Sequence, residues 1–140
     1  MDKVVIDTNV ILDYLSAKRP RHLEAVMLLE TLLSSDDLEP VVLAGSIKDV
    51  NYIMCRHYGK EAPVRSRLNA FRSIVSVYDL SNAVLNDAFA SSEPDLEDAI
   101  VCASAEALDA RAIVTRDAAA FKTSRVPSMD AREFCFSLDE

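Results

Sequence analysis

Short apolar segments alternate with longer helical stretches along this chain. The segments Lys3–Ile6, Val41–Ala44, Ile74–Tyr78 and Ala112–Thr115 are mostly β-branched and bounded by polar or turn residues, which is typical of short buried strands. A weaker fifth strand is expected to begin at Val126. Strands separated by helices imply right-handed crossovers and a parallel sheet that is covered on both faces. The sequence therefore predicts an α/β protein with three layers, α/β/α, around a sheet of four to five strands.

The most regular helical pattern covers residues 23–33. Its apolar residues recur at helical spacing, so one face of this helix is expected to be buried. That face is predicted to hold Leu23, Val26, Met27 and Leu33, widened by Leu28, Leu29 and Leu32.

Residues that favour helix ends mark the remaining helices. Ser46 is predicted to cap the start of a helix that runs through His57 and closes at Gly59. Pro63 suits the first position of the next helix, where its missing N–H group costs nothing. Ser81 is predicted to cap a further helix.

The composition is that of a compact globular chain. A length of 140 residues fits one domain, 1–140, which can bury roughly two-thirds of the surface that the unfolded chain exposes. No apolar run approaches the roughly 18 residues of a membrane span, so a cytoplasmic protein with no membrane partner is expected. Cys55, Cys102 and Cys135 are widely spaced among apolar neighbours, and they are predicted to be buried, reduced thiols.

Four aspartates stand just beyond apolar segments or at apparent helix starts. Asp7, Asp49 and Asp117 follow the first, second and fourth segments, and Asp98 opens a helical stretch. Open α/β sheets bind ligands beyond the carboxyl ends of their strands, so these four side chains are expected to meet at one edge. The sequence therefore predicts a metal site.

Helix capping offers a simpler explanation for two of these acids. Asp49 lies three residues after Ser46, and Asp98 lies three after Asp95, which is the spacing of a capping box. The other two acids follow apolar segments where no cap is needed, and a carboxylate at a buried strand end is costly unless it is paired or bound to a metal. Glu97 lies about 100° around the helix from Asp98. Asp98 is therefore expected in the site, with Asp95 nearby and Glu97 facing elsewhere.

Charge defines the chemistry that such a cluster can perform. Two carboxylates about 4 Å apart repel by roughly 4 kcal/mol at an effective dielectric near 20, so the cluster needs a cation. Arg116 is the only base expected beside the acids. An oxygen-only donor set without His or Cys favours Mg²⁺ or Mn²⁺ over zinc, and these ions suit phosphodiester hydrolysis.

At these residues the chain resembles the PIN-domain family of metal-dependent nucleases, which includes the VapC-type toxins of toxin–antitoxin pairs. The resemblance covers nearly the whole chain, and it rests on the order and spacing of residues 5–10, 46–52, 98–101 and 113–117, followed by Phe121. It implies Asp7, Asp49, Asp98 and Asp117 as the catalytic metal ligands, Asn9 and Thr115 as polar supports, and Ser46 as a cap or phosphate contact.

The chain departs from the family pattern at two positions. The second acid of the family is often the longer Glu, whereas this chain has Asp49. In the family, an acid or amide often comes just before the Phe, whereas this chain has Ala120 before Phe121. Both departures bear on whether a second metal site can be filled.

Two other α/β families that carry carboxylates are excluded by their own requirements. A haloacid-dehalogenase-like phosphatase needs a second Asp two residues after the first, where this chain has Asn9. A receiver domain needs an acidic pair near its first strand and a Lys after a late strand. Here Asp2 precedes the first strand, and Lys122 lies well past Thr115.

The net charge of −8 opposes long-range attraction of a polyanion, so any affinity for nucleic acid has to be local. Two groups of bases could hold phosphates, although solvation of a helix face is the commoner role for such charges. An acidic surface instead suits a basic partner, such as an antitoxin tail. The two basic groups are Lys18, Arg19 and Arg21, and the helical set Arg65, Arg67 and Arg72.

The predicted acidic site and the resemblance together indicate a divalent-metal-dependent endoribonuclease, the toxin of a toxin–antitoxin pair. The resemblance further implies an RNA substrate, a basic antitoxin and a homodimer. A catalytically weak PIN-like module that binds RNA or a partner protein is the alternative. A nuclease that acts on DNA would differ only in its substrate.

Overall fold

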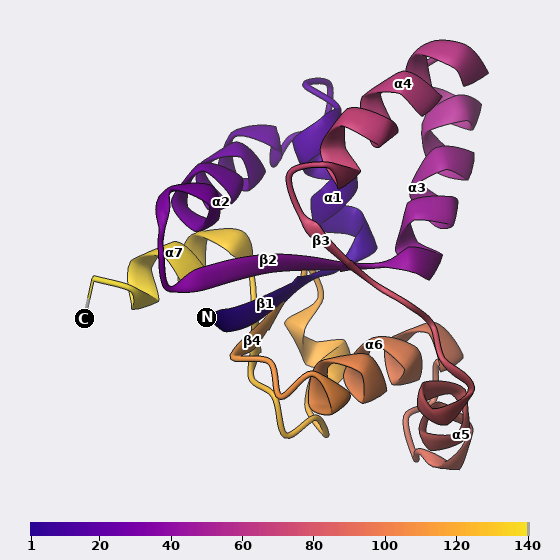
Figure 1. The fold of residues 1–140 in the computed structure, drawn as a ribbon, viewed down its shortest axis with the longest axis vertical. Coiled ribbons are helices and arrows are strands. Elements are labelled where there is room, and N and C mark those ends of the chain that lie inside the picture. The colour runs from indigo at the N-terminus through magenta and orange to yellow at the C-terminus, as the bar shows by residue number, and fades with distance from the viewer. Residues whose placement is uncertain (140) are drawn as a thin grey trace.

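The structure is a computed structural model that describes residues 1–139, and its strands form one parallel sheet (Figure 1). The sheet has five strands in the order β3-β2-β1-β4-β5, and every pair is parallel. The prediction of short parallel strands is confirmed, although β2 starts three residues earlier than expected and both β3 and β5 start two residues later. The bounds are β1 Asp2–Ile6, β2 Leu38–Leu43, β3 Ser76–Tyr78, β4 Ala112–Val114 and β5 Ser128–Met129.

Seven α-helices and one short 3₁₀ turn connect the strands within residues 1–139. No helix in this part of the chain combines the length and the hydropathy that crossing a membrane requires. The bounds are α1 Thr8–Leu15, α2 His22–Ser34, α3 Ala44–His57, α4 Glu61–Arg72, α5 Asn82–Ala90, α6 Leu96–Ala107 and α7 Ala131–Ser137, with the 3₁₀ turn at Ala118–Phe121.

Alternate residues of each strand point to opposite layers, as the pleat of a strand requires. Val4 and Ile6 pack into a core with α1, α2, α3, α4 and α7, whereas Val5 packs into a second core with α6. Figure 1 shows the first group of helices on one side of the sheet and α5 and α6 on the other. The predicted α/β/α layering is therefore confirmed.

The helix predicted over residues 23–33 is α2, and its buried face contains the predicted Leu28, Leu29 and Leu32 but not Leu23, Met27 or Leu33. Leu23 and Leu33 are 79% and 47% exposed, and Met27 is also largely exposed. So many residues of this helix are apolar that spacing alone does not identify the side that meets its neighbours α1 and α7. The buried residues are Ala25, Leu28, Leu29 and Leu32.

Two predicted helix starts are also displaced. The helix α3 begins two residues before Ser46, whose hydroxyl instead accepts a hydrogen bond from Thr8 Oγ1 at 3.1 Å. Pro63 is the third residue of α4 rather than the first, which is tolerated because that N–H group also lacks a helical partner. The cap at Ser81 is confirmed, since its Oγ accepts from the Val84 N–H group at 3.1 Å.

The three cysteines are free thiols, as predicted. Cys102 is buried against the sheet, but Cys55 and Cys135 are only half-buried. Burial was therefore predicted correctly for Cys102 alone.

Candidate active site

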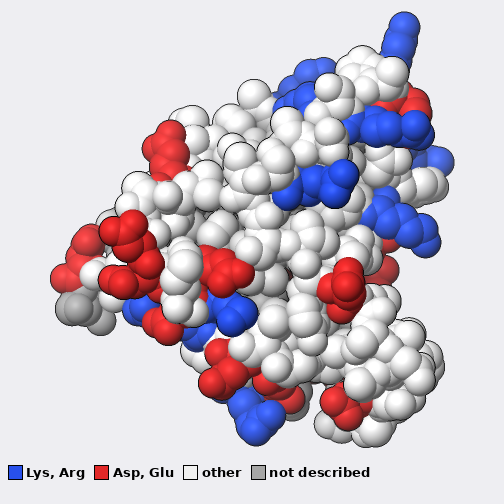
Figure 2. Space-filling model, viewed as in Figure 1, with Lys and Arg blue, Asp and Glu red and all other residues white. Residues whose placement is uncertain are grey.

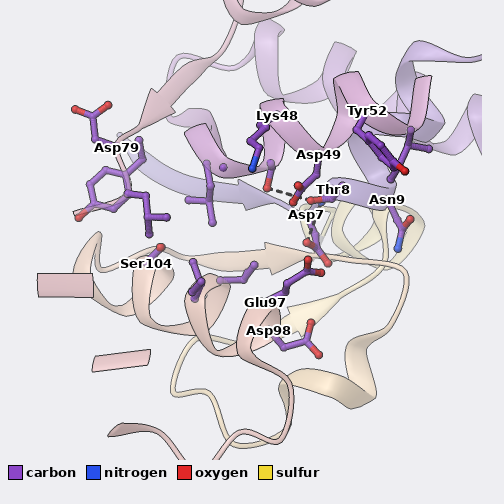
Figure 3. A pocket seen from close by; sticks show the side chains of 18 residues that line it. Asp7, Thr8, Asn9, Lys48, Asp49, Tyr52, Asp79, Glu97, Asp98 and Ser104 are labelled. Atoms are coloured by element: carbon purple, nitrogen blue, oxygen red, sulfur yellow. Dashed lines mark hydrogen bonds between the residues drawn. The ribbon is translucent and has the colours of Figure 1, made fainter. Parts of the chain in front are cut away.

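A cavity of about 640 Å³ opens at the carboxyl ends of β1, β2 and β3, between α3 and α6 (Figure 3). Asp7 enters it from the end of β1, Asp49 from the second turn of α3 and Asp98 from the first turn of α6. Three of the four predicted acids thus line one cavity at the edge of the sheet where ligands of such folds bind. Asn9 and Ser46 line it as well.

Asp7 is the most constrained of the acids. Its Oδ1 accepts from the Thr8 N–H group at 2.8 Å and its Oδ2 accepts from Thr115 Oγ1 at 2.9 Å. Asp7 is therefore the N-cap of α1, and the expectation that no cap is needed at this position was wrong. Burial raises the pKa of Asp7, the two hydrogen bonds oppose that rise, and the nearby charge of Asp117 adds to it.

The first turn of α6 presents two acids to the cavity. Asp95 caps this helix, because its carboxylate accepts from the Asp98 N–H group at 3.2 Å. Partial burial, followed by repulsion from Asp95 and Asp7, raises the pKa of Asp98 to about 6. Glu97 also lines the cavity, so the expectation that it faces elsewhere was wrong. The two side chains leave the helix in different directions, yet the cavity wall extends over both (Figure 3).

Asp49 and Ser46 lie on the first two turns of α3. Asp49 is half-buried on the cavity wall, and it is too far along the helix to form the capping box that its spacing from Ser46 allowed. The buried Ser46 hydroxyl joins the start of α3 to the start of α1 through Thr8 (Figure 3).

Asp117, the fourth predicted acid, is exposed and is not among the described residues that line the cavity. Its N–H group donates to Thr115 Oγ1 at 3.2 Å, so the threonine that holds Asp7 also holds the backbone of Asp117. The charge of Asp117 contributes to the raised pKa values of both Asp7 and Asp98, which places it close to both.

The basic residue of the site is not the one predicted. Arg116 forms an ion pair with the buried Asp13 at 3.5 Å. Lys48 instead lines the cavity and points into it (Figure 3). The sequence could have indicated Lys48 as a site residue, because it directly precedes Asp49 in the same predicted helix. Tyr52, one helical turn further, and Asp79 at the end of β3 also line the cavity and were not predicted.

A sequence profile of the PIN domain matches residues 3–119. The chain belongs to the PIN-domain family. No curated protein matches the sequence.

Solved structures of toxins share this PIN-domain fold. VapC20 of Mycobacterium tuberculosis, described as a sarcin–ricin-loop-cleaving toxin, matches with a TM-score of 0.66 and 14% identity, covering 79% of this chain and 86% of that one. VapBC2 of Rickettsia felis, bound to a DNA fragment of its promoter, matches with a TM-score of 0.70 and 17% identity, covering 91% and 98%. A toxin–antitoxin complex from Klebsiella pneumoniae matches with a TM-score of 0.68 and 20% identity, covering 91% and 97%.

The donors of this PIN domain fit a hard divalent cation by their chemistry. Every predicted ligand is a carboxylate, and the described residues that line the cavity include no His or Cys, so the donor set suits Mg²⁺ or Mn²⁺. Within residues 1–139, however, no three Asp, Glu, His or Cys side chains lie close enough together to hold a metal ion as they stand.

Proposed function

We propose that this PIN domain is a cytoplasmic, divalent-metal-dependent endoribonuclease and the toxin of a toxin–antitoxin pair. The observation that carries the proposal is the convergence of Asp7, Asp49 and Asp98 on one cavity, with the charge of Asp117 acting on Asp98. Membership of a family of nucleases and the likeness in fold to solved VapC toxins support it.

The side chains have distinct roles in the proposal. Asp7, Asp49, Asp98 and Asp117 would hold Mg²⁺ or Mn²⁺, which supplies a polarised water and neutralises charge on the scissile phosphate. Thr115 keeps Asp7 oriented through its hydrogen bond, and Asn9 and Ser46 add polar groups to the wall. Lys48 contributes a positive charge to a cavity that is otherwise acidic.

Cleavage of RNA tests the enzyme directly. Purified protein with Mn²⁺ is expected to cleave RNA and leave 5′-phosphate ends, and to lose this activity in EDTA or in Asp98→Ala. Asp87→Ala is the matched control, because this exposed aspartate also lies on a helix, α5, but does not line the cavity. Cleavage by Asp98→Ala at the wild-type rate would refute the assignment of the site.

Metal binding can be measured without turnover. Calorimetric titration is expected to detect Mg²⁺ or Mn²⁺ binding by the wild type, and Asp7→Asn should weaken it sharply because one anionic ligand is lost. Asn retains an oxygen that can accept from Thr8, so the cap of α1 survives the change. Equal metal affinity in the two proteins would remove the centre of the proposal.

A PIN-like module that binds RNA or a partner protein without efficient cleavage is the second candidate. The spread of the carboxylates within residues 1–139, the short Asp49 and the absence of an acid or amide at Ala120 favour it. Metal binding without cleavage across a broad panel of RNAs would identify this candidate. The antitoxin and the homodimer are parts of the first proposal, the toxin. Co-purification of the protein with a basic partner chain would test the antitoxin.

A further inference from the structure

The charges of the molecule are separated between two parts of the chain. Residues 44–72, which form α3 and α4, contain six Lys or Arg residues and two acids, a net charge of +4. The rest of the chain contains nine Lys or Arg residues and twenty-one acids, a net charge of −12. Figure 2 shows Lys and Arg gathered over the part of the surface that Figure 1 assigns to α3 and α4. An acidic protein therefore carries one local basic surface, and that surface adjoins the cavity.

Most cations of this basic surface have no carboxylate partner. Within residues 1–139, Arg65 is the only one of the six that forms an ion pair, with Glu61 at 2.6 Å. In the basic cluster that follows α1, Arg19 is largely buried and its Nε donates to Asp13 at 2.7 Å. Arg19 is therefore held by a structural ion pair, whereas most cations of residues 44–72 can contact a ligand.

Three residues of α3 lead out of the cavity in a line. Lys48, Tyr52 and Arg56 are spaced four residues apart, so they lie on one side of the helix and span about 12 Å along its axis. Lys48 and Tyr52 line the cavity (Figure 3), and Tyr52 is 62% exposed. Arg56 Nη1 donates to the Tyr52 hydroxyl at 3.4 Å, which joins the middle member of the line to the one farthest from Lys48. We call these three residues the α3 stripe.

We propose that the α3 stripe is a track for single-stranded RNA, with phosphates on Lys48 and Arg56 and one base stacked on Tyr52. Proteins that bind single strands combine a basic surface with exposed aromatic rings on which bases stack. An acidic peptide would use the two cations but would gain nothing from the exposed ring between them. The track rests on the proposed function, because it would deliver the strand to the acids of the cavity.

Binding of a labelled RNA in EDTA tests the track without requiring cleavage. Fluorescence anisotropy with a fluorescein-labelled, unstructured 12-nucleotide RNA at low salt gives the Kd of each variant. Tyr52→Ala is expected to weaken binding roughly 5- to 150-fold, which is the effect of losing one stacked base, whereas Tyr52→Phe keeps the ring and should remain near the wild type. Arg56→Gln should lower the slope of log Kd against log salt concentration by about 0.7, the contribution of one phosphate contact on a single strand.

Arg111→Gln is the matched control for charge. Arg111 is exposed and precedes β4, at the opposite edge of the sheet, so its loss removes the same charge away from the cavity. Equal weakening by Arg56→Gln and Arg111→Gln, unchanged binding by Tyr52→Ala, or no binding by the wild type would each overturn the track. Displacement of RNA by polyglutamate as effectively as by unlabelled RNA would instead assign the surface to an acidic protein.

The same measurements separate this inference from the proposed function. Binding that depends on Tyr52 and Arg56 in a protein that never cleaves RNA supports the track and refutes the nuclease. If cleavage requires Asp98 but the Kd for RNA is unchanged in Tyr52→Ala, the nuclease is supported and the track is refuted.

Discussion

Single carboxylates in this molecule differ sharply in what they do, although the sequence presents them alike. Asp7 is held by two hydrogen bonds at the end of a strand, while Asp98 is perturbed mainly by partial burial and by neighbouring charge. Asp13 is 2% exposed and contacts two arginines, so it belongs to the structure rather than to the cavity. Burial and partners, which no local sequence pattern reports, decide among these roles.

The raised pKa of Asp98 predicts a specific dependence of stability on pH in the metal-free protein. The unfolded chain releases this proton near pH 4, whereas the folded chain retains it up to about pH 6. Between these values the folded state binds more protons, so this group lowers the free energy of unfolding as the pH rises, and its effect is complete above the folded pKa. Urea unfolding in EDTA at several pH values should therefore show Asp98→Asn gaining stability over the wild type between about pH 4 and 6. A difference that stays constant across this range would contradict the prediction.

Asp13 is predicted to matter for stability more than any exposed ion pair. It accepts from Arg19 Nε at 2.7 Å and lies 3.5 Å from Arg116 Nη1, so removing it leaves cations without their partner at a buried site. Asp13→Ala should lower the free energy of unfolding by about 3–5 kcal/mol. Asp2→Ala is the control, because its pair with Arg111 at 3.3 Å is exposed, and such pairs contribute about 0–1 kcal/mol. Urea denaturation compares the two, and similar losses would show that burial is not the decisive factor.

At the scale of elements, strands were easier to predict than helix boundaries and faces. Runs such as Val4–Ile6 and Ile113–Thr115 are apolar, β-branched and bounded by polar residues, so only a buried strand suits them. Helix α2 has apolar residues around most of its circumference, and its orientation is decided by packing against α1 and α7. The start of α3 was misplaced because Ser46 suits a cap, whereas the structure uses its hydroxyl to join two helices.

The candidate site was likewise predicted where it depends on the order of the elements and missed where it depends on contacts between distant residues. The acids were predicted because strand ends place them at one edge of the sheet, which depends only on the order of the elements. Glu97 was misassigned because the cavity extends across both directions in which the first turn of α6 presents its acids. Arg116 was expected beside the acids because it directly precedes Asp117, and its pairing with Asp13 could not be predicted because it depends on a contact between distant parts of the chain.

The corrected face of α2 can be tested with two substitutions of the same type. Leu29 is 1% exposed and Leu33 is 47% exposed. Leu29→Ala should lower the free energy of unfolding by about 2–5 kcal/mol through lost burial and a cavity, whereas Leu33→Ala should change it by about 0.5 kcal/mol or less. Helix propensity is equal in the two variants, so any difference reports packing. Urea denaturation that gave the reverse order would contradict the packing of α2 described above.

For the whole molecule, the separation of charge resolves a difficulty that the net charge of −8 poses for a nuclease. All but two of the acids lie outside residues 44–72, and Lys48 of the basic surface lines the cavity. A strand of RNA can therefore approach along the basic surface while the acidic body repels it elsewhere. The acidic cavity is at the same time complementary to a basic inhibitor, so substrate and antitoxin would meet the molecule through opposite charges.

Growth of bacteria that express the chain alone tests the toxin assignment. An active ribonuclease without its antitoxin should slow growth, and Asp7→Asn should abolish the effect because the cavity loses a ligand while the cap of α1 is retained. Asp37→Asn removes the same charge at an exposed position before β2, at the opposite edge of the sheet, and should remain toxic. A basic antitoxin segment should restore growth and compete with Mn²⁺ in calorimetry, because both require the same carboxylates. Normal growth on strong expression of folded wild-type protein would reject the toxin and leave a PIN domain with another role.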